Sequence, residues 1–332
     1  MAPDDNHLLI TGGAGFLGRH LARAYAERGR RVTVLDDLSC TNSHFGTPEL
    51  DHPCIRCVRG STLDGGLLDG LLRTHGRVIH FASVVGVGTT IDAPMETALN
   101  LTGTIQLAQR LTPAHTVLFG SSADVYGMHS RVYPSPMRED DDVLYEHALV
   151  NRWVYPRVKA VEENVIAASP ARGVIVRIFN CVGPGMDYPH AKRVVPQFMD
   201  AVLRRRPLRL SGDGGQVRCF CHYRDTLAGI GQALEWAAAQ APGAACAVNI
   251  GSDEPVTIRD LAHTVNRLAV EMGILDAPLP VVPDPGELYS QPFEDGWNRI
   301  PDLRRARDLF GYAPTVGLEA MLRETLEWCR GR

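Results

Sequence analysis

Short apolar runs alternate with helix-length segments through the first half of the chain, and this alternation constrains the fold more than any other feature. Strand-like runs lie at residues 7–11, 31–36, 77–83, 116–122 and 173–180. Helical patterns separate them, at about 17–28, at about 98–110 and around Lys159. Strands separated by helices imply crossover connections, and hence a parallel sheet that is covered on both faces. The sequence therefore predicts a doubly wound α/β fold.

Gly and Pro residues at 181–190 interrupt the regular alternation of strand-like and helical segments. Before this point we expect a dinucleotide-binding Rossmann domain over residues 1–182, with returning segments at about 222–265. After it we expect a smaller C-terminal α/β lobe that binds substrate and is discontinuous within residues 183–332.

The composition excludes several classes of protein. The chain has 332 residues, of which 45% are hydrophobic and 22% charged, and its formal net charge is −4. This balance is typical of a soluble globular protein and favours neither nucleic-acid binding nor a membrane-surface patch. We see no membrane-spanning stretch and no secretory signal, and expect a cytoplasmic protein. The eight cysteines lack partners at zinc-site spacing, so we expect reduced thiols and no metal site.

The sequence TGGAGFLG places Gly12, Gly15 and Gly18 between a predicted strand and a predicted helix. Such glycines permit a tight turn and the close approach of a pyrophosphate, and the helix N-terminus supplies unpaired N–H donors. About twenty residues later the next strand ends in Asp36, which can accept hydrogen bonds from an adenosine ribose and would repel a 2′-phosphate. This context predicts NAD rather than NADP, the alternative being a glycine turn with an acidic strand end and no ligand.

Tyr155 and Lys159 stand four residues apart at the front of a predicted helix, and therefore on one face of it. An ammonium group near the phenol would favour ionisation, and a nicotinium ring would act in the same direction. Both effects would turn a tyrosine with an ordinary pKa of about 10 into a base near neutral pH. Alone this spacing is more often structural. Beside a dinucleotide fold and the serine-rich end of the 116–122 strand, it predicts catalysis.

Taken together, the motifs resemble the extended short-chain dehydrogenase/reductases, specifically their nucleotide-sugar epimerase, dehydratase and decarboxylase group, over nearly the whole chain. The resemblance is carried by TGGAGFLG, HFAS followed by VVGV, NLTGT, SSADVYG, NRWVYPRVKA, RIFNCVGPGMD, RVVPQF, LSGDGGQVRCF and NRIPD. It implies that Tyr155 takes the proton of a substrate 4-hydroxyl while C4 gives hydride to NAD. Ser122 is implied to hydrogen-bond the same hydroxyl, and Lys159 to help organise the transfer.

The resemblance also implies which residues contact the two ligands. The expected cofactor contacts are Gly12, Gly15, Phe16, Leu17, Gly18, Asp36, Ser61, Thr62, Phe81, Ala82, Ser83, Asn100, Tyr155 and Lys159. The expected nucleotide-sugar contacts are Val85, Ser122, Asn180, Val195, Arg218 and Arg299. Two arginines suit a diphosphate through charge-assisted hydrogen bonds. The alternative, stronger for Arg299, is that they cap helices or pair with surface acids. A homodimer through helices near 98–110 and 151–168 is implied as well.

The residues after Ser122 bear on the reaction that follows oxidation at C4. Ala123 stands where dehydratases of the group carry an acid, which disfavours dehydration and is similar to 4-epimerases. Asp124 stands where decarboxylases and dehydratases carry a glutamate that acts at C5, although a loop-capping role is equally open. Gly185 replaces an arginine of uronate-handling relatives, whereas NRWVYPRVKA and RCF are similar to that branch.

We therefore expect an NAD-dependent 4-epimerase that acts on a UDP-hexose or UDP-hexuronate, with Asp124 among its catalytic residues. A UDP-glucuronate decarboxylase is the alternative. A dehydratase ranks below both, and so does an NAD-binding protein without turnover, because Tyr155 and Lys159 are both present.

Overall fold

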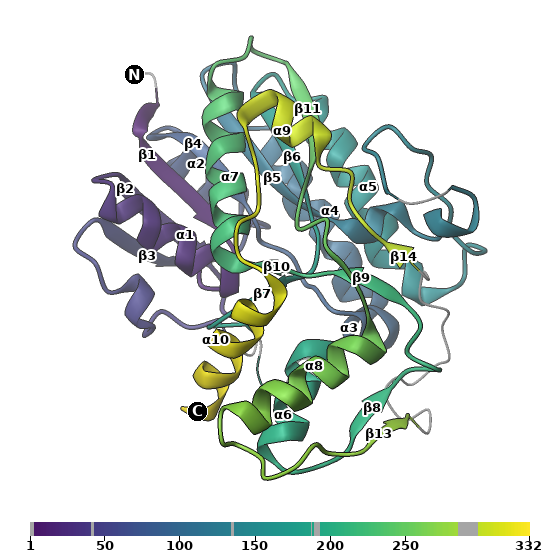
Figure 1. Cartoon of the computed structure of the whole chain (residues 1–332). Helices are drawn as coiled ribbons and strands as arrows, with labels where there is room; N and C mark the ends of the chain where they lie inside the picture. Colours follow the sequence, from purple (N-terminus) through teal and green to yellow (C-terminus); the bar gives the residue numbers. More distant parts are fainter. Residues whose placement is uncertain (1–2, 41–42, 134–135, 187, 189–192, 285–297) are drawn as a thin grey trace.

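A seven-stranded parallel sheet forms the centre of the molecule (Figure 1) and confirms the predicted fold. The computed structural model describes residues 3–40, 43–133, 136–186, 188, 193–284 and 298–332. The strands are β1 (Asp4–Thr11), β2 (Arg31–Asp36), β3 (Ile55–Arg59), β4 (His75–His80), β5 (Thr116–Ser122), β6 (Arg172–Ile178) and β11 (Ala245–Ile250). Their order is β11-β6-β5-β4-β1-β2-β3, with parallel pairing throughout. Strands such as β2 and β6 are rich in valine and isoleucine because both faces of the sheet are buried.

Helices cover both faces of the sheet (Figure 1). They are α1 (Phe16–Glu27), α2 (Gly65–Leu72), α3 (Val87–Asp92), α4 (Pro94–Ala108), α5 (Val154–Ala167), α7 (Tyr223–Ala238) and α9 (Arg304–Phe310). Helices α1, α7 and α9 contribute to one hydrophobic core, and α2, α4 and α5 to another. Helix α4 begins earlier than the pattern suggested because Pro94, which fits the first turn of a helix, starts it.

The strand order reverses between β1 and β4, and this reversal fixes where a ligand can bind. In open parallel sheets, ligands bind beyond the carboxyl ends of the strands at such a point. The glycine-rich turn follows β1, residues 81–86 follow β4, and Ser122 ends β5. The topology therefore brings most of the predicted site to one edge of the sheet.

A second hydrophobic core lies in the C-terminal lobe. It is built from α6 (Val194–Leu203), β8 (Leu208–Leu210), α8 (Ile258–Glu271), β13 (Val281–Pro283) and α10 (Leu318–Arg330). Short strands lie between this lobe and the large sheet: β7 (Cys181–Val182), β9 (Val217–Cys219), β10 (Cys221–His222), β12 (Pro255–Thr257) and β14 (Asn298–Arg299).

The returning segment differs from the expected 222–265. Helix α7 and strand β11 do pack with the large sheet, but α8 packs in the lobe because its apolar stripe faces α6 and α10. The chain returns once more at Leu303, Ala306 and Tyr312, whose side chains complete the core around α7.

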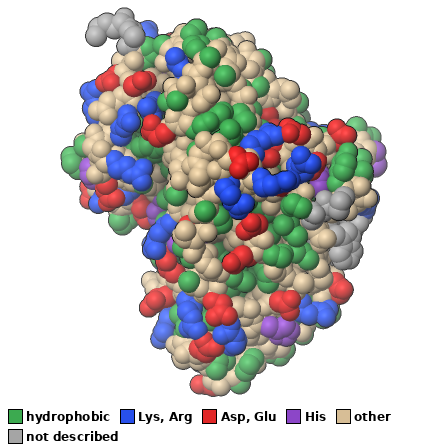
Figure 2. Space-filling view, turned by 45° about the horizontal axis from the view of Figure 1, so that its top comes forward, with side chains coloured by type: hydrophobic (Ala, Val, Ile, Leu, Met, Phe, Trp, Pro, Cys, Tyr) green, Lys and Arg blue, Asp and Glu red, His purple; other side chains and the backbone are tan. Residues whose placement is uncertain are grey.

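Positive and negative side chains intermingle on the face shown in Figure 2, in keeping with the small formal net charge. Among the described residues, no helix combines the length and the apolar character needed to cross a bilayer. Within the same residues, no cluster of three or more His, Cys, Asp or Glu side chains could hold a metal ion. The eight cysteines are free thiols.

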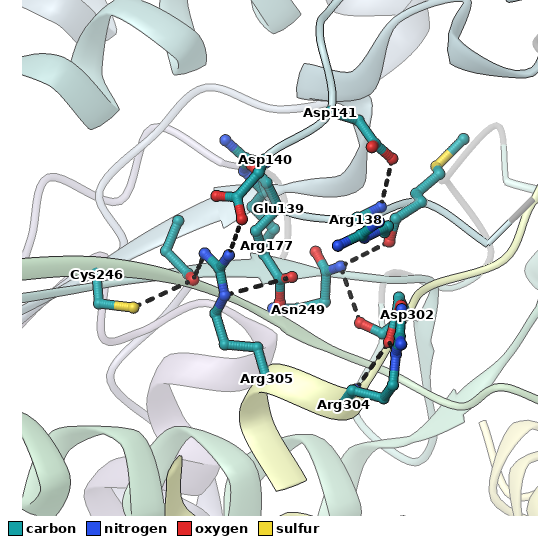
Figure 3. Close-up of polar contacts among 12 residues, drawn as sticks. Arg138, Glu139, Asp140, Asp141, Arg177, Cys246, Asn249, Asp302, Arg304 and Arg305 are labelled. Atoms are coloured by element: carbon teal, nitrogen blue, oxygen red, sulfur yellow. Dashed lines mark hydrogen bonds and ion pairs between the residues drawn. The ribbon is translucent and has the colours of Figure 1, made fainter. Parts of the chain in front are cut away.

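A buried amide in β11 joins two segments that are distant in sequence (Figure 3). The side-chain nitrogen of Asn249 donates to the carbonyl oxygens of Met137 (3.0 Å) and Asp302 (3.1 Å). Its side-chain oxygen accepts a hydrogen bond of 2.7 Å from the Tyr126 hydroxyl, and its backbone N–H donates to Glu139 over 2.8 Å. These bonds fix the chain on either side of the candidate site.

Replacing Asn249 by alanine is expected to lower the free energy of unfolding by about 3 kcal/mol, because several buried polar groups lose their partners. Asn164→Ala is the matched control, since this exposed amide donates to the Ala160 carbonyl within its own helix. We expect the control to cost less than about 0.5 kcal/mol. Urea unfolding of both variants measures the difference, and equal losses would contradict the structural role of Asn249.

Candidate active site

The glycine-rich turn is packed so closely against the backbone that no side chain fits at Gly12 or Gly18. Gly12 has a φ of +67°, and a Cβ atom there would lie 2.6 Å from the backbone nitrogen of Ala82. A Cβ atom at Gly18 would lie 2.6 Å from the carbonyl oxygen of Gly12. Gly15 precedes α1, and no side chain caps that end of the helix. The N–H groups of the first helical turn are therefore available to a pyrophosphate.

Asp36 ties the end of β2 to this turn. Its carboxylate accepts hydrogen bonds from the backbone N–H groups of Ala14 (3.0 Å) and Leu38 (2.8 Å). Burial raises the pKa of Asp36, and the two N–H donors oppose that rise. An acid fixed beside the glycine turn is suited to the adenosine ribose of NAD, so the residues here fit the expected cofactor.

The other expected cofactor contacts lie on segments that follow neighbouring strands. Asn100 of α4 holds the segment after β4, because its amide exchanges hydrogen bonds of 2.8 Å and 3.0 Å with the backbone of Val84. The ring of Phe81 packs so closely on Gly120 that a Cβ atom there would lie 2.2 Å from it. Ala82 and Ser83 belong to the same segment.

After β3, Thr62 packs against Gly103 of α4 and is buried. Its neighbour Ser61 accepts a hydrogen bond from the Leu63 N–H (3.3 Å). In the first turn of α1, the Phe16 ring meets His20 edge-on, with 5.7 Å between the ring centroids, and Leu17 follows it.

Ser122 and Tyr155 meet at the end of β5. Ser122 is the last residue of that strand, Tyr155 lies in the first turn of α5, and the Ser122 side chain acts to lower the pKa of Tyr155. The pKa of Tyr155 is raised, because burial and the charges of Asp124 and Glu162 outweigh the hydrogen bond from Ser122. The phenol of the chain alone therefore holds its proton at neutral pH.

The net shift in the chain without cofactor is upward, whereas Lys159 was expected to act in the opposite direction. The ammonium nitrogen of Lys159 lies 5.9 Å from the centroid of the Tyr155 ring, so the two groups are neighbours as predicted. However, the same nitrogen forms an ion pair of 3.2 Å with Glu162, whose carboxylate offsets its charge. The sequence analysis passed over Glu162, which stands three residues after Lys159.

Asp124 lies between two guanidinium groups. Its Oδ1 atom is 3.0 Å from Arg152 Nη2 and 2.6 Å from Arg299 Nη1. Burial acts to raise the pKa of Asp124, but the charges of Arg299 and Arg152 prevail and hold it well below its usual value. The carboxylate consequently stays ionised and cannot supply a proton. Its backbone N–H, rather than its side chain, takes part in the local turn, donating to Ser122 over 3.1 Å.

Arg152 is the second residue that the sequence analysis missed. It lies in the short 3₁₀ turn η4 (Asn151–Trp153) directly before α5, and its side chain is almost fully buried. Its place three residues before Tyr155, in NRWVYPRVKA, is the signal that could have found it. Nothing in that local pattern gives Asp124 as its partner.

The predicted substrate contacts fall into two groups. Arg299 and Arg218 are register partners in the neighbouring strands β14 and β9, and both are buried. Arg299 also pairs with the half-buried carboxylate of Asp124. Asn180 has a φ of +22° and donates to the Cys219 carbonyl over 2.9 Å. The Val195 side chain packs within the lobe core.

Two further residues bear on the substrate side. Val85, after β4, is 39% exposed and could meet a ligand. Gly185 is the position at which the resemblance would lead one to expect an arginine. A Cβ atom there would lie 2.7 Å from the guanidinium of Arg19, which donates to the Gly185 carbonyl. Arg19 of α1 thus occupies the space beside the Gly-Pro-Gly turn.

Gly12→Ala is expected to abolish NAD binding, because the new methyl group would meet the backbone of residues 81 and 82. Gly29→Ala is the matched control: its φ of +77° carries the same left-handed strain, of about 1 kcal/mol, but nothing lies within 4 Å of the new atom. Isothermal titration of NAD into both variants separates the two effects. Normal affinity in Gly12→Ala would contradict the assigned cofactor site.

Comparison with known proteins agrees with this geometry. The family model described as the NAD dependent epimerase/dehydratase family matches residues 8–251. The chain is 33% identical to a UDP-N-acetyl-alpha-D-glucosaminuronate decarboxylase of Bacillus cytotoxicus, with 97% of each chain covered. It is 25% identical to a UDP-glucose 4-epimerase of Rhizobium leguminosarum bv. trifolii, covering 97% of this chain and 96% of that one.

Among solved structures, MoeE5 in complex with UDP-glucuronic acid and NAD is similar to this chain. The TM-score is 0.76 at 26% identity, with 98% of this chain and 99% of MoeE5 covered. The glycine turn, the strand order and these matches lead to one conclusion: the chain belongs to the NAD-dependent epimerase/dehydratase family, within the nucleotide-sugar group of extended short-chain dehydrogenase/reductases.

Proposed function

We propose that this enzyme oxidises C4 of a UDP-linked hexuronate and that the resulting 4-keto acid loses its carboxylate as carbon dioxide. The observation that carries the proposal is the cluster of Arg152, Asp124 and Arg299, whose arginines are buried and whose carboxylate acts on Tyr155. Guanidinium groups suit a substrate carboxylate because they donate charge-assisted, often bidentate hydrogen bonds to it. The 33% identical relative is named as a decarboxylase of such a sugar.

The first chemical step falls to Ser122 and Tyr155. Ionised Tyr155 accepts the proton of the 4-hydroxyl, which Ser122 holds by a hydrogen bond, while C4 loses hydride. The glycine-rich turn and Asp36 would hold NAD, which when bound would supply the acceptor for that hydride. Ser122 ends β5 and Tyr155 lies in the first turn of α5, so both side chains lie at the same end of the sheet.

The second step breaks the bond between C5 and C6. Once C4 is a ketone, the carboxylate is in the β position, and the electron pair of the broken bond passes to the C4 oxygen as carbon dioxide leaves. Ser122 and the now protonated Tyr155 can both hydrogen-bond this developing negative charge. C5 then takes a proton from water, because Asp124 is held ionised by its arginines. Hydride returns to C4 as Tyr155 gives back its proton.

A 4-epimerase, which is the activity that the sequence predicts, is the second candidate. The pairing of Asp124 favours it, since a carboxylate engaged by two arginines is poorly placed to act on C5. Ala123, which is buried and carries no acid, fits this reaction equally well. In this case the 4-keto sugar would turn over and accept hydride on its other face, with no change in mass.

Mass spectrometry of the products separates the two candidates. We expect UDP-glucuronate or UDP-N-acetylglucosaminuronate to lose carbon dioxide, and the matched sugars without a carboxylate, UDP-glucose and UDP-N-acetylglucosamine, to be unchanged. An isomer of unchanged mass, resolved by chromatography, would instead identify the epimerase.

Tyr155→Phe is expected to lower turnover by about 10³-fold while NAD remains bound, because the variant lacks the base. Tyr133→Phe is its control, since the Tyr133 hydroxyl pairs with Asp142 on an exposed loop. Near-parental turnover in Tyr155→Phe would refute the assignment of the base.

We also propose that two copies of the chain pair through α4 and α5. Large apolar side chains are exposed on both helices: Met95 (78%) and Leu99 (51%) on α4, and Val161 (46%) on α5. Light scattering after gel filtration should give twice the mass of one chain, and Leu99→Glu should give the monomer. Leu309→Glu, on α9, is the control and should leave the mass unchanged; a parent protein that elutes as a monomer would contradict the pairing.

A further inference from the structure

Lys159 and Glu162 form a buried ion pair to which the proposed reaction steps assign no role. The nitrogen of Lys159 and the Oε2 atom of Glu162 are 3.2 Å apart, and the two side chains are 2% and 0% exposed. The same nitrogen donates to the Gly120 carbonyl (3.2 Å) and lies 4.5 Å from the centroid of the Phe119 ring. A buried pair is weak evidence for stability, because desolvation of both charges offsets their attraction. Its presence therefore calls for another explanation.

A chain of hydrogen bonds fixes the carboxylate of this pair. Thr104 of α4 donates to the Oε1 atom of Glu162 over 2.5 Å, and its oxygen lies 3.0 Å from His80 Nε2. His80 Nδ1 lies 2.6 Å from the Thr11 hydroxyl, which accepts the backbone N–H of Ala82 at 3.2 Å. These residues come from β1, β4, α4 and α5, so the series of hydrogen bonds runs from the glycine-rich turn to Lys159 and Tyr155.

One arrangement of protons satisfies the whole chain. Because Thr104 donates to Glu162, it accepts from His80 Nε2–H, and His80 Nδ1 is then left to accept from Thr11. This arrangement requires a neutral imidazole. Burial and the charge of Lys159 lower the pKa of His80 to about 3, so the ring is neutral at any working pH. His80 therefore neither takes up nor releases a proton near neutral pH.

We propose that Glu162 is a positioning residue that fixes the Lys159 ammonium and offsets its charge, so that Tyr155 stays protonated unless a positive nicotinamide ring lies beside it. The proposal rests on the proposed function only in taking Tyr155 as the base. The consequence is that the protonation of Tyr155 follows the oxidation state of the cofactor. Tyr155 is ionised when the cofactor is oxidised, at the stage when Tyr155 must accept a proton. It is protonated when the cofactor is reduced and the proton must return.

The charges around Tyr155 support this balance. Lys159 and Glu162 belong to its own helix, Asp124 approaches from the end of β5, Arg193 acts from the start of α6, and His80 of β4 is neutral. Glu162 and Asp124 both raise the pKa of Tyr155, whereas Arg193 lowers it. Replacing Glu162 by a neutral residue therefore lowers the pKa of Tyr155.

Carbon-13 NMR of tyrosine-labelled protein, saturated with NAD or with NADH, measures this titration directly. The Tyr155→Phe variant identifies the signal. In the parent, the midpoint for Tyr155 should be at least about one pH unit lower with NAD than with NADH, since one pKa unit needs only a modest charge interaction. In Glu162→Gln, both midpoints should fall by about one unit or more.

Glu163→Gln is the matched control, because the neighbouring carboxylate is also buried but faces Arg177 (2.7 Å) and Ser121 (2.6 Å). It should leave the Tyr155 midpoint within about 0.3 units of the parent value. Equal midpoints in Glu162→Gln and the parent, or an equal shift in Glu163→Gln, would overturn the proposal. If Glu162→Gln does not fold, the test uses the parent protein alone. Equal titration midpoints of Tyr155 with NAD and with NADH would also overturn the proposal. The measurement needs no sugar, so its failure is distinct from failure of the proposed reaction.

Discussion

The carboxylate of Asp124 joins three parts of the chain that no local pattern connects. It lies one turn beyond β5, it meets Arg152 from the turn before α5, and it meets Arg299 from a short strand 175 residues away. Because the two arginines are buried, loss of the Asp124 carboxylate would remove compensation from both of their charges. The position of α5, and with it of Tyr155, is thereby coupled to the segment that closes the site from the C-terminal side.

Charge compensation recurs throughout the site. Lys159 faces Glu162, Arg177 faces Glu163, and Asp124 faces its two arginines. The paired carboxylates of Asp124 and Glu162 nevertheless still act to raise the pKa of Tyr155. The pKa of the Tyr155 phenol then depends on small differences between opposing charges. Under this condition, adding or removing one charge has a large effect on that pKa.

The sequence was sufficient for the features that depend on local pattern. Alternating strands and helices, the glycine turn and the Tyr155–Lys159 spacing predicted the large sheet and the family, because each is encoded within a few consecutive residues. Helix α8 was assigned to the wrong core, since an amphipathic stripe does not say which partner it faces. The clusters of Arg152 with Asp124 and of Glu162 with Thr104 could not be foreseen, because their members lie 28 and 58 residues apart.

The pKa of Tyr155 shows a different limit. Spacing correctly placed an ammonium group beside the phenol, but the sign of the shift depends on burial and on a second charge. These quantities belong to the folded chain and not to any motif.

The late return of the chain to the large sheet has a consequence for biosynthesis. Leu303, Ala306 and Tyr312 fill the core around α7, although most of that core comes from residues before 251. A ribosome must therefore release nearly the entire polypeptide before the nucleotide-binding half can close its interior. Until then the part of α7 that α9 covers lacks its packing partner, and a product truncated before α9 would leave that part exposed.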